Sequence, residues 1–279
     1  MLARRSSPPL VNKRLKDRRR RDRHRAHVLF AILLAVLTGA FIWLTWQPYV
    51  RIERMTISNG DPRLLALVEG ELVGTYFGLV PRDSFFFTPA RAIRATIESA
   101  DAGIQAISVR HDDLTTLIIA LHERVPIARW CGLVPSDSAV PSDGEYCYVF
   151  DAEGYLYAVA DVAVGSTPLN TFTVYDSLLG GVEEPLRSTL THARAMPDAF
   201  DFARRISSLG SPVERIIFKD DEVELLLRSG TRLTHVLGSE EETFANLMSA
   251  KGNFDLTDGS IDYVDLRFPA EVYLKRHGE

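Results

Sequence analysis

The sequence predicts an α+β protein with one N-terminal transmembrane helix and two folded domains beyond it. A basic tail runs into an uncharged apolar stretch, a strand, two helices and two strands then follow, and the rest consists mainly of short β-like segments with helices between some of them. An apolar share of 46% with 25% charged residues excludes general disorder. The predicted parts are a tail at 1–27, the transmembrane helix at 28–46, a first domain at 49–124 and a second at 125–279.

The apolar stretch VLFAILLAVLTGAFIWLTW at 28–46 contains 19 residues without a formal charge. As a helix it would rise about 28 Å, close to the hydrocarbon thickness of a bilayer. The tail carries 11 of the 32 basic residues and 2 of the 37 acidic ones, so its net charge is +9 and that of the other 252 residues is −14. This basic flank, with Trp43, Trp46 and Tyr49 at the far end, predicts a single span of the cytoplasmic (inner) membrane with the N-terminus inside.

Two alternatives apply to this region. A cleavable signal peptide needs a small-x-small site, and Thr38-Gly39-Ala40 is a weak example, but the apolar run continues six residues beyond it. The segment RRRRDRHR could attract nucleic acid by charge alone. A short basic tail beside a span is more simply an orientation signal and a contact for anionic lipid, so we expect a membrane and no specific nucleic acid as partner.

The first domain is predicted to be a two-layer α+β module. VRIERMTISN is a strand, and Asp61 with Pro62 begins a helix that carries an apolar stripe. Thr88-Pro89 begins a second helix, and the strands IQAISVR and TTLIIALHER follow. The order strand, helix, helix, strand, strand resembles a POTRA domain, a small protein-interaction fold. Pro126 then interrupts the ladder while keeping the chain extended, which marks the junction with the second domain.

The second domain is predicted to be a sheet of antiparallel strands with flanking helices. Asp151 to Gly154 forms the turn of an aromatic-rich hairpin, and VERIIF, EVELLLR and TRLTHVL are successive strands. One helix covers about 197–209. Another begins at Ser239 with a capping box to Glu242, and its Phe244, Leu247 and Met248 are expected to face the sheet.

The last predicted strand, IDYVDLRFPAEVYLK, is interrupted by Pro269. Because proline cannot donate to a β-ladder, this strand is expected at a sheet edge or a bulge. An open edge favours aggregation unless something covers it, and one solution is a partner that adds its own strand.

The only cysteines, Cys131 and Cys147, flank a Ser/Pro/Asp-rich loop. Outside the membrane they are expected to form a disulfide, with two buried free thiols as the alternative. Neither has a second ligand at zinc-like spacing, and the sequence contains no phosphate loop, nucleophile elbow or zinc-protease helix. We therefore expect no catalytic residues, no metal and no cofactor, and a protein that is not an enzyme.

Four short phrases carry a family resemblance: ERVPIARW at 123–130, VFDAEGYLY at 149–157, LG at 237–238 before a helix, and IDYVDLRFP at 261–269. With the basic tail, the single span, the POTRA-like module and the β-rich domain, they resemble the FtsQ/DivIB family of bacterial cell-division proteins. The phrases are short, but they follow one another in the family's order over nearly the whole chain.

The resemblance implies a non-enzymatic scaffold of the divisome, at the division septum, that helps to control septal peptidoglycan synthesis. The implied partners are FtsB/DivIC-like and FtsL-like single-span proteins, and other divisome membrane proteins through the POTRA module. The family's docking edge corresponds here to the segment from Val264 to Leu274. The partner-binding residues that we expect are Val264, Arg267, Phe268, Tyr273 and Leu274. For Arg267 and Phe268 the alternative is ordinary sheet packing.

Two other functions remain as alternatives. A POTRA-bearing component of envelope assembly or secretion would need a barrel of many strands after the module, and only about 155 residues follow it. A membrane-tethered cell-wall hydrolase would need a converging set of acid, base or nucleophile, for which the sequence offers no motif.

Overall fold

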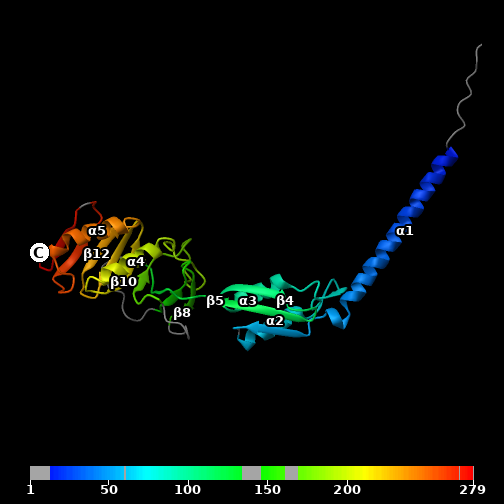
Figure 1. Cartoon of the computed structure of the whole chain (residues 1–279), viewed down its shortest axis with the longest axis horizontal. Helices are drawn as coiled ribbons and strands as arrows, with labels where there is room; N and C mark the ends of the chain where they lie inside the picture. The colour runs from blue at the N-terminus through cyan, green and yellow to red at the C-terminus, as the bar shows by residue number, and fades with distance from the viewer. Residues whose placement is uncertain (1–12, 60, 134–145, 161–168, 270, 279) are drawn as a thin grey trace, which may run out of the picture. The chain divides into compact units, whose positions relative to one another are not determined.

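The computed structural model describes residues 13–59, 61–133, 146–160, 169–269 and 271–278, and its architecture is α+β. The chain divides into two compact units (Figure 1). Unit 1 comprises residues up to Ala100 together with Ile107–Leu121, and unit 2 comprises Asp101–Ala106 together with His122–Glu279. Strand β4 (Ile104–His111) therefore begins in unit 2 and continues in unit 1.

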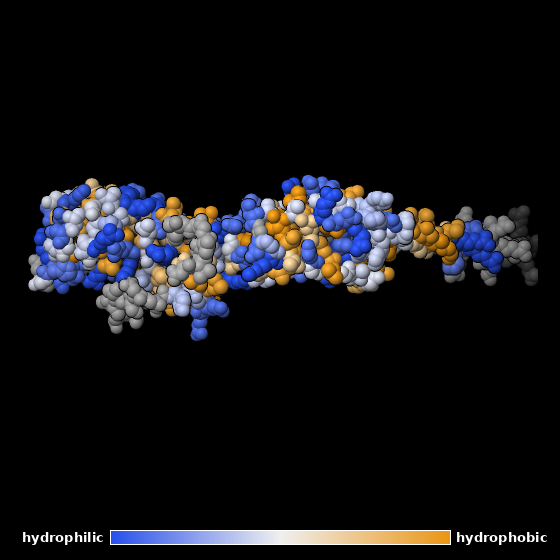
Figure 2. Space-filling model, turned by 90° about the horizontal axis from the view of Figure 1, so that it is seen from below, coloured by the Kyte–Doolittle hydropathy of each residue, from blue (hydrophilic) through white to orange (hydrophobic). Residues whose placement is uncertain are grey.

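The N-terminal part of the chain is one continuous helix, α1 (Lys13–Thr45), which confirms the predicted apolar helix. By length and composition its part Arg21–Thr45 can cross a membrane. Most of its large apolar side chains are exposed, as expected of a helix that lipid would surround. In Figure 2 the visible helix is hydrophobic next to the folded unit and hydrophilic toward the N-terminus.

Unit 1 contains a three-stranded sheet in the order β1-β5-β4, with β1 (Arg54–Ser58) parallel to β5 (Thr116–Glu123). The short helix η1 (Pro48–Val50) precedes β1. The helices α2 (Pro62–Leu72) and α3 (Ala90–Ala100) follow β1 and contact each other. The side chains of the unit's core come from both helices and the sheet: Leu64, Val68, Ile93, Ile97, Leu117, Ile119 and Leu121.

Local signals explain these elements. The carboxylate of Asp61 accepts a hydrogen bond of 2.9 Å from the Arg63 N–H, so the predicted cap of α2 is confirmed. In β5 the buried residues alternate, which places one face of the strand in the core. A hairpin of two-residue strands, β2 (Thr75–Tyr76) and β3 (Val80–Pro81), was not predicted.

Unit 2 contains a mixed nine-stranded sheet in the order β14-β13-β12-β11-β10-β9-β6-β7-β8. Its first half consists of β6 (Ala128–Trp130), β7 (Tyr148–Phe150), β8 (Leu156–Val159) and β9 (Thr173–Tyr175). Its second half consists of β10 (Val213–Lys219), β11 (Glu222–Leu227), β12 (Arg232–Val236), β13 (Ile261–Asp265) and β14 (Tyr273–Arg276). The predicted β7–β8 hairpin and the antiparallel series β10, β11, β12 are confirmed. The prediction of antiparallel strands throughout is wrong, because β9 pairs in parallel with β6 and β10, and β12 pairs in parallel with β13.

One face of this sheet is covered by α4 (Met196–Ser207) and α5 (Glu240–Ala250), which contact β10, β11 and β12 (Figure 1). The short helix η2 (Lys251–Asn253) follows α5. In β11 the side chains of Val223, Leu225 and Leu227 are buried, whereas those between them are partly exposed. The sheet therefore has a core face under the helices and an opposite, more open face.

Two details of α5 differ from the prediction. The helix follows Ser239, but the Ser239 hydroxyl donates to the Val236 carbonyl instead of accepting from the helix, so the predicted capping box is wrong. The carboxylate of Glu240 accepts from the Gly238 N–H instead. Leu247 is fully buried and Phe244 packs on the core, but Met248 is largely exposed because it lies on the outer side of the helix.

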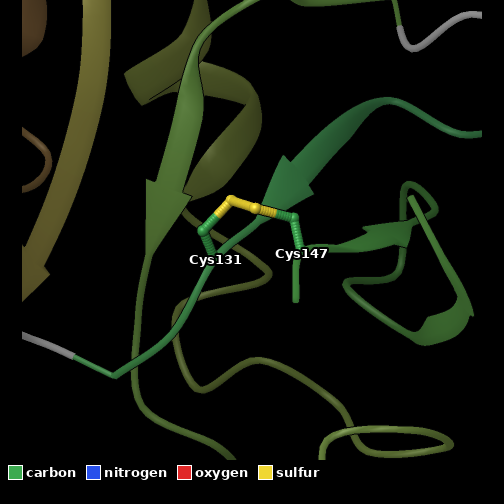
Figure 3. The surroundings of a disulfide bond; sticks show 2 residues. All are labelled: Cys131 and Cys147. Carbon is green, nitrogen blue, oxygen red and sulfur yellow. A yellow bond between two sulfur atoms is a disulfide. The ribbon is translucent and has the colours of Figure 1, made fainter. Parts of the chain in front are cut away.

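Cys131 and Cys147 are joined by a disulfide, so the expected pair is present (Figure 3). Cys131 follows β6, and Cys147 precedes β7, the antiparallel partner of β6. Cys131 packs with Tyr175 and Ile217 in a small apolar cluster. The bond closes a chain segment of sequence separation 16 at one end of the β6–β7 pair.

Candidate partner-binding edge

The C-terminal segment forms an antiparallel hairpin at one end of the nine-stranded sheet. We expected one long strand interrupted by Pro269, but β13 and β14 pair with each other, and Pro269 lies in the connection between them. Proline supports this reversal because it leaves no N–H to satisfy in a ladder. Among the described residues no strand pairs with the outer side of β14, so β14 is the edge strand.

Arg267 holds the beginning of this connection against the sheet. Its guanidinium donates to the Asp265 carboxylate at 2.6 and 2.9 Å and to the Glu222 carboxylate at 2.9 Å. These hydrogen bonds raise the pKa of Arg267, and those with Asp265 have the largest effect. The Arg267 side chain in turn lowers the pKa of Asp265. Because Glu222 belongs to β11 and Asp265 to β13, Arg267 bridges strands on both sides of β12.

Two aromatic side chains form the exposed feature beside the edge. Phe268 and Tyr273 are 47% and 51% exposed, and their rings meet edge to face with centroids 5.3 Å apart. The Tyr273 hydroxyl donates to the Glu271 carboxylate, which raises the pKa of Tyr273. Large aromatic side chains that stay exposed beside an unpaired strand are typical anchors for a protein partner.

The structure separates the five expected partner-binding residues into two groups. Arg267, Phe268 and Tyr273 lie at the surface. Val264 is fully buried and Leu274 packs against the core, so both hold the hairpin on the sheet. The pairing of Val264 with Leu274 across β13 and β14 explains this, since opposite residues share one face.

The sequence prediction missed Tyr263 and Glu222. Tyr263 is exposed and pairs with Arg232 on one side and Lys275 on the other, so these three residues lie on the open face of the sheet. Glu222 becomes relevant only through Arg267, which lies 45 positions later in the chain. Ile261 and Val264 are both buried but lie three positions apart, which departs from the two-residue period of a strand. This departure was the available sign that Tyr263 faces outward.

One buried acid–histidine pair in unit 2 resembles part of a catalytic apparatus. The Asp176 carboxylate lies 2.6 Å from His192 Nδ1 and also accepts a hydrogen bond of 2.9 Å from the backbone N–H of His192. Burial raises the pKa of Asp176. A hydrolase of the serine type needs a nucleophile on the second ring nitrogen. In the described ranges no hydroxyl or thiol bonds to His192 Nε2, and no three potential metal ligands cluster.

Comparison with known proteins does not assign this chain to a family. No protein-family model matches the chain, and a search of curated proteins gives no significant match.

Proposed function

We propose that this protein is a non-enzymatic, membrane-anchored scaffold of bacterial cell division of the FtsQ/DivIB type. The observation that carries the proposal is the unpaired β14 edge with the exposed Phe268 and Tyr273 beside it. The four sequence phrases and the order of basic tail, apolar helix, small α+β unit and larger sheet unit support it. In this function the chain links division proteins and so helps to control septal peptidoglycan synthesis.

The membrane anchor in this proposal is α1. Its apolar part would span the cytoplasmic membrane once, and the basic residues before Val28 would remain on the cytoplasmic side. Both units would then lie outside the membrane, where the Cys131–Cys147 disulfide is stable. Unit 1 would serve as the POTRA-like module, which its strand-helix-helix-strand-strand order supports, and would bind other divisome membrane proteins.

The proposed partner at β14 is an FtsB/DivIC-like protein, with an FtsL-like protein in the same complex. A strand of that partner would hydrogen-bond to the outer side of β14, and a side chain would pack on the Phe268–Tyr273 rings. Lys275 and Arg276 lie on β14, which disfavours pairing of two copies of this edge and favours a partner strand with acidic residues nearby.

The test is co-purification of the full chain with its FtsB/DivIC-like partner. Phe268→Glu is the sharper variant, because the Phe268 side chain is half exposed and its ring contacts only Tyr273 among the described aromatic contacts. Arg267→Glu should also reduce recovery, but it adds a third carboxylate beside Glu222 and Asp265 and so disturbs the connection itself. Met248→Glu is the control, since Met248 is equally exposed on α5.

We expect recovery of the partner to fall for Phe268→Glu and to stay unchanged for Met248→Glu, with equal melting temperatures. Unchanged recovery for Phe268→Glu would exclude this edge as the docking site. A tagged full chain should also concentrate at the division septum, and uniform labelling of the envelope in dividing cells would contradict the division function.

A further inference from the structure

The turn between β2 and β3 contains Phe77, a residue type that the backbone conformation of this turn disfavours. Phe77 and Gly78 have φ values of 52° and 72°, and the Leu79 N–H donates to the Tyr76 carbonyl at 2.9 Å. Positive φ at both central residues is the type I′ pattern, in which Asn-Gly is preferred and a bulky residue is strained. Phe77 is nevertheless there, and its side chain is 99% exposed. A strained and fully exposed aromatic residue indicates a function other than folding.

This turn is attached to the end of α1. The indole N–H of Trp46, just after the helix, donates to the Leu79 carbonyl at 2.9 Å. The Phe41 ring on the helix lies 5.7 Å from that of Phe86 and 6.1 Å from that of Phe87. Two separate segments of unit 1 therefore contact the end of the apolar run, one through Phe41 on the helix and one through Trp46 directly after it.

These contacts fix the depth of the two segments relative to the apolar stretch. Phe41 lies five positions before Trp46, which ends the uncharged run. At about 1.5 Å per residue, Phe41 is about 7 Å inside the end of that run. If the run spans the bilayer, the residues that touch Phe41 must reach the boundary between headgroups and acyl chains.

The composition of the two segments fits that environment. Residues 73–81 contain no charge, and 84–89 contain none either. Val73, Phe77, Leu79, Phe86 and Phe87 are all exposed, which is a larger apolar grouping than water favours at a protein surface. The cation nearest to both segments in the sequence is Arg82, whose guanidinium lies over the Tyr76 ring and forms no ion pair in the described part of the chain. An arginine at this level can meet lipid phosphate.

We propose that the β2–β3 turn and the Phe86–Phe87 segment form a lipid-binding surface that enters the interfacial zone of the outer leaflet. This surface, defined by Phe77, Leu79, Phe86 and Phe87, rests on the membrane anchor of the proposed function and is independent of the division role. Lipid is the occupant because the surface contacts Phe41 and Trp46 at the end of the apolar run, which lipid surrounds when that run spans the bilayer. Its consequence is a second point of attachment that restricts the orientation of unit 1 on the membrane.

The experiment uses the full chain in liposomes, with one introduced cysteine at a time labelled by an environment-sensitive fluorophore. The native cysteines are paired in the disulfide and stay unlabelled under oxidising conditions. Phe77→Cys reports on the turn, Val36→Cys on the middle of the uncharged run at 28–46, and Ala100→Cys on the far, exposed end of α3. Two liposome samples are compared, in which part of the lipid carries a nitroxide quencher either near the headgroup end of its acyl chain, to report on position 77, or near the methyl end, to report on position 36.

We expect the label at position 77 to lose most of its fluorescence in quencher liposomes and the label at position 100 to lose little. If position 36 is quenched and position 77 is not, the lipid-binding surface is excluded while the anchor stands. A turn shielded only after a protein partner is added would likewise assign the surface to protein. If position 36 is not quenched either, the membrane anchor itself is wrong, and the proposal with it.

A second variant separates Phe77 from its neighbours. Phe77→Asn suits the positive φ of the turn, so the hairpin should stay folded, as circular dichroism and melting would show. With the label at Leu79→Cys, this substitution should reduce quenching several-fold. Equal quenching with and without the Phe77 ring would exclude that ring as a lipid anchor.

Discussion

The guanidinium of Arg124 forms an ion pair with the carboxylate of Asp151, whose side chain is only 3% exposed. Arg124 also donates to the Ala102 carbonyl at 3.2 Å and lies over the Tyr155 ring at 4.1 Å. The second oxygen of Asp151 accepts the N–H groups of Glu153 and Tyr155, both at 3.0 Å, and so builds the turn before β8. Two of the four phrases behind the family resemblance therefore meet in one buried contact.

Replacing Arg124 by Met should destabilise unit 2. The variant leaves the Asp151 carboxylate buried without its counter-charge, and removing one partner of such a pair costs about 3–5 kcal/mol. Urea unfolding of the purified full chain measures this loss. Arg129→Met is the matched control, because Arg129 is exposed on β6, and it should change the free energy of unfolding by less than about 0.5 kcal/mol.

The ion pair is distinguished from simple packing by a double-mutant cycle with Asp151→Asn. If the charge on Asp151 causes the loss, Arg124→Met should cost much less in the Asp151→Asn background. Equal costs in both backgrounds would show that Arg124 acts through its packing on Tyr155 instead.

Gly154 in the same turn should not tolerate a side chain. Its φ is 73°, and an added Cβ would lie 2.5 Å from the Ala193 Cβ. Gly154→Ala should therefore cost more than about 3 kcal/mol, from backbone strain and overpacking together. Gly230→Ala is the control: its φ is 93° but its surroundings are open, so only the strain of about 1–2 kcal/mol should appear in urea unfolding. Equal losses would contradict the contact with Ala193.

Features with a local cause could be predicted from the sequence. Asp61 begins α2 as expected because a cap depends on the residues beside it. The alternation in β5 and the Asp151–Gly154 turn could likewise be predicted, because a strand period and a turn each depend on a few consecutive residues.

The features that were missed depend on contacts between distant segments. The β2–β3 hairpin has two-residue strands, which are too short for a period, and Phe77 replaces the expected turn residue. The C-terminal strand folds back because β13 finds partners on both sides, which a continuous alternating pattern does not reveal. The hydrogen bond from Arg267 to Glu222 forms only because the sheet order brings β11 and β13 to either side of β12. This part of the candidate edge could therefore not be predicted from the sequence.

The disulfide should contribute measurably to stability. It closes a segment of sequence separation 16, which corresponds to about 3 kcal/mol in the chain-entropy model. The double variant Cys131→Ala, Cys147→Ala should lose about this amount in urea unfolding under oxidising conditions. Reductant should destabilise the natural chain by a similar amount and leave the variant unchanged. An equal effect of reductant on both would show that the bond does not stabilise the fold.

Burial of His235 should make unit 2 sensitive to acid. The side chain is fully buried against Phe202, with ring centroids 4.4 Å apart, and neither ring nitrogen has a hydrogen-bond partner among the residues that the structure describes. Burial lowers its pKa to about 4, although the Glu240 carboxylate lies 3.8 Å from Nε2. Since an unfolded histidine has a pKa of about 6.5, the unfolded state binds the proton first as the pH falls.

The free energy of unfolding is therefore highest above about pH 6.5, where His235 is neutral in both states, and it falls as the pH drops toward 4. Between pH 7.5 and pH 5 the loss should be about 2 kcal/mol. His235→Leu removes the titrating group and keeps an apolar side chain against Phe202. The difference in unfolding free energy between the natural chain and this variant should shift by that amount over the same range. Other groups, including Asp176 with its raised pKa, are common to both proteins and cancel in the difference. A difference that is independent of pH would show that His235 is not held neutral in the fold.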